Sequence, residues 1–191
     1  MKIPEVPITL LMAHPDDEII FGWPVLPYAK KVICCSNDRY NYEITKWKDR
    51  HVAIKEVCEL LKLELVCLDY NSNFYQLPPQ ELNEFKIKVS ELIKDEPVIF
   101  AHNKWGEYGH LDHILIHNLA KEVKKEIIVS DIMIGSDYTG FVETKKPLIE
   151  DYIECKNDMS IYKPCKLIYA SYNGWTWSEA AIQKAKIYYD K

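Results

Sequence analysis

Five short apolar runs recur along the chain and predict the strands of a buried sheet. They are Ile8–Ala13, Val32–Cys35, Leu65–Leu68, Val98–Ala101 and Ile127–Val129. Each run is continuous and does not alternate between apolar and polar positions, which is typical of strands that are covered on both faces. The pattern therefore favours a mainly parallel sheet.

Helical periodicity separates these runs. Apolar residues repeat at intervals of three and four positions within Ile54–Leu61, Leu82–Leu92 and Ile116–Val123. Because strands and helices alternate, we expect an α/β fold with helices layered on a mainly parallel sheet. Two further helices are expected nearer the C-terminus, over Leu148–Met159 and Ser178–Tyr189.

Composition adds limits to this picture. The chain has 191 residues, of which 48% are hydrophobic and 28% charged, so residues 1–191 are interpreted as a single ordinary domain. A net charge of -5 argues against nucleic acid as a partner, because proteins that neutralise phosphates are usually basic. No apolar run is long enough for a signal core or a membrane span, and a cytoplasmic location is expected. The six cysteines form no C-x-x-C pair, which predicts free thiols.

Ionisable residues crowd the end of the first predicted strand, where His14, Asp16, Asp17 and Glu18 follow one another closely. Ligands of open α/β sheets bind beyond the carboxyl ends of the strands. Neighbouring carboxylates repel one another when ionised, so a cation is expected nearby, and histidine with aspartate suits zinc. Asp16 and Asp17 point in different directions in such a turn and need not share a role. The alternative is that both aspartates cap the next helix.

A second cluster follows the fourth predicted strand. His110, Asp112, His113 and His117 fall within eight positions at a predicted helix start. Catalytic zinc sites take three protein ligands and leave one position for water, so one histidine of this cluster could complete a site begun by the first. Two questions stay open at this level. His113 and His117 could form a helical metal pair, and His102, at the strand end, could support the site from behind.

The two clusters resemble the LmbE-like or PIG-L family of zinc-dependent N-acetylglucosaminyl deacetylases. The likeness rests on the run AHPDDE at residues 13–18 and the run GHLDH at residues 109–113. It covers residues 7–125, and it implies a Rossmann-like α/β sandwich of three layers with a mainly parallel sheet.

The resemblance also implies a metal site and a base. It assigns the zinc ligands to His14, Asp17 and His113, and it makes Asp16 the general base that activates water. Ferrous iron suits a ligand set of two histidines and one aspartate almost as well as zinc does.

Four more residues receive expected roles from the resemblance. His110, protonated and held in place by Asp112, is expected to steady the oxyanion of the tetrahedral intermediate, and Tyr108 to assist there. Arg50 matches an arginine near the start of a family helix. Its guanidinium suits a substrate oxygen or acidic group, and the alternative is a pairing with a neighbouring acid.

The expected reaction is therefore removal of an N-acetyl group from a small, sugar-like substrate that contains N-acetylglucosamine. Two alternatives stay open. One is a metal hydrolase of another amide, ester or carbamoyl bond, and the other is a non-catalytic metal-containing binding module. A homo-oligomer is compatible with the sequence.

Overall fold

A seven-stranded sheet forms the centre of the part of the chain that the structure describes. The structure is a computed structural model and describes residues 2–37, 49–132, 149, 151–155, 159–172 and 182–191. The strands lie in the order β3-β2-β1-β4-β5-β7-β6. They are β1 (Ile8–Met12), β2 (Ala29–Ser36), β3 (Glu64–Tyr70), β4 (Val98–Ala101), β5 (Ile127–Ser130), β6 (Tyr152–Ile153) and β7 (Ile187–Asp190). β1 to β5 pair in parallel, and β7 runs antiparallel to both β5 and β6.

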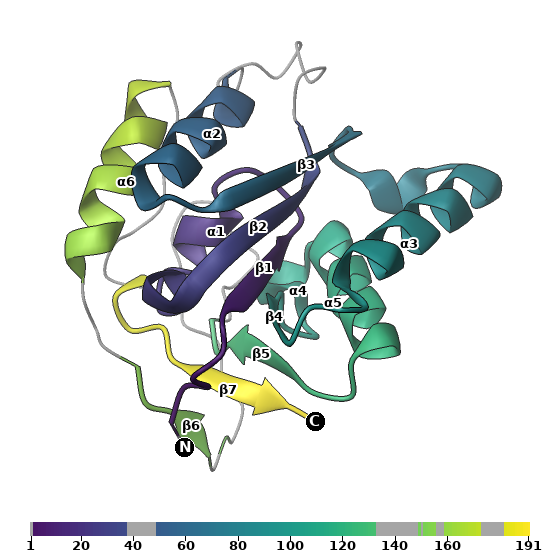
Figure 1. Ribbon diagram of the computed structural model, residues 1–191. Coiled ribbons are helices and arrows are strands. Elements are labelled where there is room, and N and C mark those ends of the chain that lie inside the picture. Colours follow the sequence, from purple (N-terminus) through teal and green to yellow (C-terminus); the bar gives the residue numbers. More distant parts are fainter. Residues whose placement is uncertain (1, 38–48, 133–148, 150, 156–158, 173–181) are drawn as a thin grey trace.

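Helices cover both faces of this sheet (Figure 1). One face carries α1 (Asp17–Ile20), α2 (Arg50–Leu61) and α6 (Met159–Ser171); the other carries α3 (Pro79–Ile93), α4 (Gly106–Gly109) and α5 (Leu111–Val123). Two 3-10 turns, η1 (Leu26–Tyr28) and η2 (Phe74–Gln76), lie in the connections. The core divides in the same way, with Ile54 and Tyr162 in the cluster on one face and Phe85 and Ile116 in the cluster on the other. The predicted three-layer α/β sandwich is confirmed.

The five predicted strands and the first three predicted helices are all present. The six cysteines are free thiols, as predicted. Both expected C-terminal helices are wrong where the structure describes them; residues 148, 150, 156–158 and 178–181 of the expected ranges lie outside the described residues. Within the first, Tyr152–Ile153 forms β6, and a helix begins only at Met159; within the second, Ile187–Asp190 forms β7. Aromatic and β-branched side chains such as those of Tyr188 and Ile187 favour strands. Antiparallel pairing with β5 supplies the backbone partners that a strand needs here. The predicted cap Ser178 lies outside the described residues.

The site sits where the strand order turns. β1 pairs with β2 on one side and with β4 on the other, and β2 and β4 lead away in opposite directions. In open α/β sheets such a switch point opens a crevice at the carboxyl ends of the strands. The chain leaves β1 just before His14 and leaves β4 just before His102. The fold thus brings the two sequence clusters to one place.

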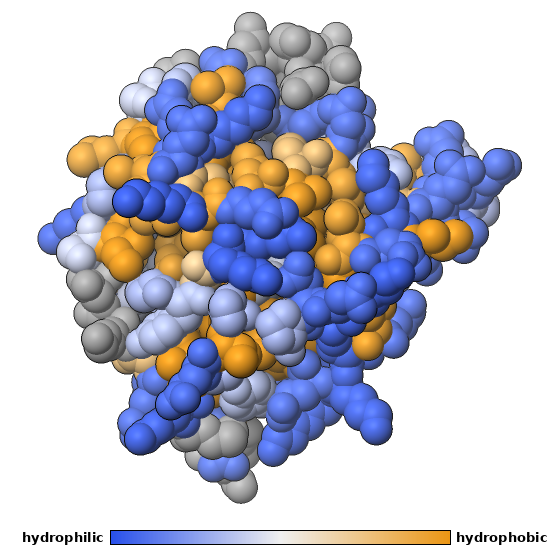
Figure 2. Space-filling view, viewed as in Figure 1, coloured by the Kyte–Doolittle hydropathy of each residue, from blue (hydrophilic) through white to orange (hydrophobic). Residues whose placement is uncertain are grey.

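Polar and charged residues cover much of the molecular surface in Figure 2, and apolar residues also reach it. In Figure 2 hydrophilic residues cover α3, and apolar residues show between the helices, over the edge of the sheet that β3 forms. Exposed large apolar side chains include Ile87 on α3 and Leu111 at the start of α5. Over the described residues, every helix is too short or too polar to traverse a lipid bilayer.

Candidate metal centre

The turn after β1 sends its two aspartates to different partners. Asp16 has a φ of 99°, a left-handed conformation that is strained for a residue other than glycine. Its carboxylate accepts a hydrogen bond from Arg50 Nη1 at 2.8 Å and caps no helix amide. Asp17 Oδ2 accepts one from the backbone N–H of His14, also at 2.8 Å. The helix-cap interpretation of Asp16 is therefore wrong, and the two carboxylates can have separate roles.

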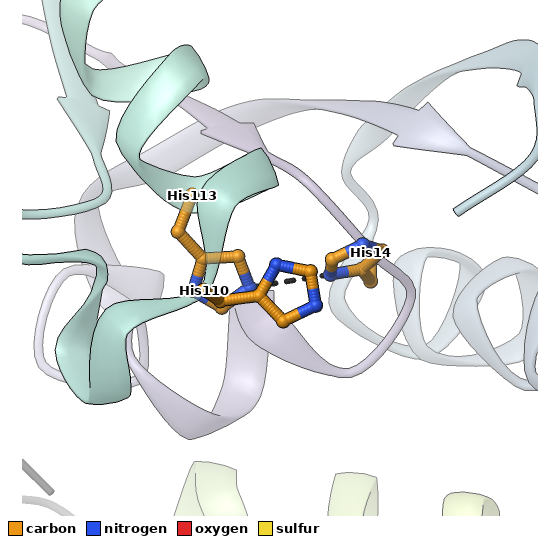
Figure 3. Close-up of side chains that lie close together, drawn as sticks. All are labelled: His14, His110 and His113. Atoms are coloured by element: carbon orange, nitrogen blue, oxygen red, sulfur yellow. Dashed lines mark hydrogen bonds between the residues drawn. The ribbon is translucent and has the colours of Figure 1, made fainter. Parts of the chain in front are cut away.

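Three potential donor atoms from the two clusters converge, one each from His14, Asp17 and His113. Figure 3 shows His14 and His113 with His110 beside them. His14 Nδ1 lies 3.2 Å from His113 Nε2, and Asp17 Oδ2 lies 3.5 Å from each of these nitrogens. Ligands of a tetrahedral zinc ion at roughly 2.0–2.1 Å stand roughly 3.3 Å from one another. The separations within this trio are those of a set of metal ligands, and all three residues are buried.

Hydrogen bonds on the far side of each ring fix its tautomer. His14 Nε2 lies 3.0 Å from Asp112 Oδ2, and His113 Nδ1 lies 2.8 Å from Glu107 Oε2. A carboxylate only accepts, so both of these ring nitrogens carry the proton. The facing atoms, His14 Nδ1 and His113 Nε2, are left with lone pairs directed at each other and at a carboxylate oxygen. Such an arrangement is repulsive by itself and suits a cation at its centre.

Two other histidines lie within reach of a metal ion but use their lone pairs elsewhere. The potential ligand groups are His14 with His110 and His113, and Asp17 with His102 and His113. His102 Nε2 accepts the N–H of Ala13 at 3.0 Å, and His110 Nδ1 accepts the N–H of Asp112 at 3.2 Å. In each neutral ring the other nitrogen then carries the proton. The trio is thus the better-suited donor set.

Three buried carboxylates surround these rings, and burial alone would raise the pKa of each. For Asp17 that effect is outweighed by positive charge at His113 and His102, which holds its pKa well below the ordinary value while those rings are protonated. The same two rings bring the pKa of Glu107 down to about 2, and His14 lowers that of Asp112. A cation among these three ionised groups would offset their charge.

The charge state of His102 has opposing determinants. Burial lowers its pKa, but the charges of Glu107 and Asp17 prevail and raise the pKa to about 9. The N–H of Ala13 nevertheless donates to its Nε2, which can accept only without a proton. A buried backbone N–H left without an acceptor is costly, so we assign a neutral ring with the proton on Nδ1.

His110 and Asp112 are adjacent, but their contact differs from the expected one. Among the described residues, the Asp112 carboxylate accepts from His14 and from the backbone N–H groups of Asn73 and Tyr75, and makes no hydrogen bond to the His110 ring. Burial and the nearby rings of His113 and His14 lower the pKa of His110 to about 3. The expectation of a protonated His110 paired with Asp112 is therefore wrong, because its Nδ1 accepts a backbone N–H.

The remaining expected residues lie at or near the trio. The ring of Tyr108 packs edge-on against His110 and His113, with centroids 5.5 and 5.4 Å away. Arg50 binds Asp16, the pairing with an acid that the sequence left open. His117 Nδ1 instead lies 2.9 Å from the carbonyl oxygen of His102, and its Nε2 lies 3.3 Å from Asp190. The helical pair of His113 and His117 is therefore not formed.

Sequence reasoning missed Glu107. Its side chain is buried, and its Oε2 contacts the Nδ1 atoms of both His102 and His113, at 3.0 and 2.8 Å. The residue lies in α4, the short turn before α5 whose backbone is non-helical at Glu107, and no periodic pattern marks a buried side chain there. The glycines at 106 and 109 were the available signal, because both have positive φ and show a tightly folded loop.

Comparison with known proteins gives a family and several structural neighbours. The family model described as PIG-L: GlcNAc-PI de-N-acetylase matches residues 9–124. The uncharacterized protein L374 of Acanthamoeba polyphaga mimivirus is 27% identical over 130 residues. The match covers 60% of this chain and 56% of the relative, so the chain spans little more than half the length of this curated relative.

Three solved structures share the fold. N,N'-diacetylchitobiose deacetylase from Pyrococcus horikoshii matches with a TM-score of 0.57 at 15% identity, over 93% of this chain and 73% of its own. A deacetylase of teicoplanin biosynthesis matches with 0.62 at 11%, over 87% of both chains. GalB, the 4-carboxy-2-hydroxymuconate hydratase of Pseudomonas putida, matches with 0.61 at 12%, over 87% and 83%. At these identities the neighbours show a common fold alone.

Proposed function

This chain belongs to the PIG-L family of LmbE-like deacetylases, and on that premise we propose that it removes an N-acetyl group from a small GlcNAc-containing molecule with the help of a bound zinc ion. The family match covers the strands and loops that carry both clusters, from residue 9 to residue 124. The proposal extends from the family to a specific reaction, metal and substrate class.

One observation carries the proposal. His14 Nδ1, Asp17 Oδ2 and His113 Nε2 converge at 3.2 to 3.5 Å, and the tautomers of both rings turn lone pairs toward the common centre. Two imidazole nitrogens and one carboxylate oxygen are a usual donor set for catalytic zinc. These three residues would hold the ion. Ferrous iron suits the same donors, and the identity of the metal is part of what is proposed.

The base of the reaction is Asp16. When bound, the ion would supply Lewis acidity and a water of lowered pKa. The Asp16 carboxylate takes a proton from the attacking water and returns it to the leaving nitrogen, so that water and amide become acetic acid and amine, and the acid then gives its proton to solvent. Arg50 orients this carboxylate through its 2.8 Å hydrogen bond, and we propose this positioning role for Arg50 in place of direct substrate binding.

His110 acts as a neutral donor. Because Nδ1 accepts the backbone N–H of Asp112, the proton of the ring is on Nε2. That N–H is proposed to donate to the carbonyl oxygen as it becomes negative, and the hydroxyl of Tyr108 is proposed as a second donor. Asp112 serves as a positioning residue for His14. A preorganised donor of this kind supports catalysis without a charge of its own.

The substrate class rests on likeness. The family description names a GlcNAc-containing lipid, and one structural neighbour is a deacetylase of diacetylchitobiose. GalB is a hydratase on the same fold, so the fold by itself does not choose the reaction. A base and a donor beside the trio favour hydrolysis over a binding role, because binding alone needs neither.

Release of acetate tests the proposal. The zinc-loaded protein is incubated with N-acetylated glucosamine derivatives and, in parallel, with simple amides, esters and carbamoyl compounds. We expect acetate from the sugar derivatives, loss of release after chelation and recovery on adding zinc. Turnover of esters or simple amides in preference to the sugars would contradict the proposed substrate class. If the zinc-loaded protein turned over none of the compounds, the proposal that it is an enzyme would be contradicted.

A further inference from the structure

We propose that Glu107 is a positioning residue of this centre, whose buried carboxylate holds the Nδ1–H of His113 and thereby turns Nε2 toward the ion. The inference rests on the proposed function for its metal, and it adds a carboxylate outside both sequence motifs. Glu107 Oε2 lies 2.8 Å from His113 Nδ1, and the side chain is 2% exposed.

The backbone at Glu107 is the first argument. Gly106, Glu107 and Gly109 have φ values of 62°, 57° and 85°, so three of four consecutive residues adopt positive φ and two of them are glycines. The ψ of Glu107 is -53°, near the strained classic γ-turn. Such a conformation costs about 1–3 kcal/mol for a residue with a side chain. Glycine would avoid that cost, so the carboxylate has to contribute something in return.

The hydrogen bonds of the carboxylate are the second argument. Oε2 contacts the Nδ1 atoms of both His113 and His102, while Oε1 accepts the backbone N–H of Asn103 at 2.9 Å. The Glu107 N–H in turn donates to the Asn103 side-chain oxygen. Both carboxylate oxygens of Glu107 therefore accept hydrogen bonds, and these bonds hold the carboxylate in a single orientation.

Asp112 offers a parallel on the other side of the centre. It holds Nε2–H of His14 as Glu107 holds Nδ1–H of His113, so each proposed imidazole ligand has its own carboxylate. A carboxylate behind a ligating histidine fixes the ring and raises its basicity. Glu107 also holds His102, whose ring stacks on that of His113 at a centroid distance of 3.8 Å. One side chain thus fixes the orientation of His113 by a hydrogen bond and through its stacked neighbour.

The test is the zinc affinity of the metal-free protein, titrated against a competing chromophoric chelator. Glu107→Gln keeps the shape of the side chain, but its N–H₂ group then faces a hydrogen-bond donor that the carboxylate had accepted from. Glu107→Gly removes the carboxylate and allows the same positive φ. Both are expected to weaken zinc binding by about 10–100-fold, as the loss of such partners does. Asp131→Asn is the matched control, because Asp131 is also buried, lies outside both motifs, and accepts hydrogen bonds from the Tyr152 hydroxyl and the Lys186 backbone N–H. It is expected to keep wild-type affinity.

Ring nitrogen shifts supply a readout that a merely structural role would not move. In the metal-free wild type, ¹⁵N spectra are expected to show the His113 proton on Nδ1, and in Glu107→Gly a mixture of tautomers. Thermal unfolding of each metal-free variant shows whether it folds. Wild-type zinc affinity in both Glu107 variants, or a metal-free wild type with the proton on Nε2, would overturn the inference.

The outcome separates this inference from the proposed function. A wild type that binds zinc more tightly than the Glu107 variants but releases no acetate would support the role of Glu107 and contradict the deacetylase. Variants that bind zinc as well as the wild type would contradict the role of Glu107 and leave the deacetylase standing.

Discussion

At the scale of single residues, hydrogen bonds on the outer side of a ring decide what its inner side can bind. The rings of His14, His102 and His110 each lie close to that of His113, with centroids 5.2, 3.8 and 4.6 Å away, yet their hydrogen-bond partners differ. Carboxylates hold the outer nitrogens of His14 and His113, whereas backbone N–H groups occupy lone pairs of His102 and His110. Residue type and spacing could indicate a cluster, but the choice of ligands within it depends on these partners.

Asp16→Asn tests the base at this scale. The amide keeps the size of the side chain but cannot take a proton, so turnover is expected to fall by about 10²–10⁴-fold. Zinc content, measured separately, is expected to stay at the wild-type level because the trio is untouched. Near-normal turnover in a variant that retains its metal would contradict the base assignment.

His110→Phe tests the donor in the same way. The ring remains, but its N–H is lost, and turnover is expected to fall by about 10²–10³-fold, the usual effect of removing one oxyanion donor. Zinc affinity is the control measurement and should not change. A large loss of zinc would show that His110 is a ligand, contrary to the assignment of its lone pair to the backbone.

At the scale of elements, the C-terminal end of α2 carries a residue that does not suit its backbone conformation. Lys62 follows α2 with a φ of 56°, and its N–H bonds to the carbonyl oxygens of Cys58 and Glu59. Glycine is the usual residue at this position because it lacks a Cβ.

Lys62→Gly is therefore expected to stabilise the protein by roughly 0.5–1 kcal/mol. The left-handed conformation costs residues other than glycine about 1–2 kcal/mol. The greater conformational entropy of glycine in the unfolded chain reduces this gain. Lys55→Gly, an exposed site inside the same helix, is the matched control and should destabilise by about 1 kcal/mol. Urea unfolding measures both. Equal effects of the two substitutions would contradict the interpretation of Lys62.

The elements that the sequence predicted are those with a strong local signal. Continuous apolar runs marked β1 to β5, and the two motifs lie directly after β1 and β4. The C-terminal third was predicted poorly because its strands depend on tertiary pairing, with β7 joining β5 and β6 in antiparallel ladders. In α6, Tyr162, Cys165 and Tyr169 are buried at helical spacing, but Pro164 lies inside the helix and argues against one. Glu107 was missed because the direction of its side chain follows from a positive φ, for which the neighbouring glycines are the sole signal in the sequence.

At the scale of the whole molecule, the centre ties the turn after β1 to the start of α5. His14 and His113 are 99 positions apart in the sequence, and they come into contact at the switch point of the sheet. An ion gripped from both sides would bind the folded chain and not the unfolded one, so it would stabilise the fold as a whole.

Thermal unfolding with and without zinc measures this coupling. Free zinc at one hundred times its dissociation constant is expected to add about 2.7 kcal/mol, which raises Tm. His113→Ala should abolish the increase, and Asp131→Asn should retain it. An equal increase in wild type and His113→Ala would mean that zinc stabilises the protein from elsewhere.

The most direct measurement is a crystal structure of the zinc-loaded protein with anomalous scattering recorded at the zinc edge. We predict one anomalous peak bonded to His14 Nδ1, Asp17 Oδ2 and His113 Nε2 at about 2.0–2.2 Å, with a position left for water. A peak coordinated by His102 or His110 in place of these atoms, or no peak between the two motifs, would contradict the account.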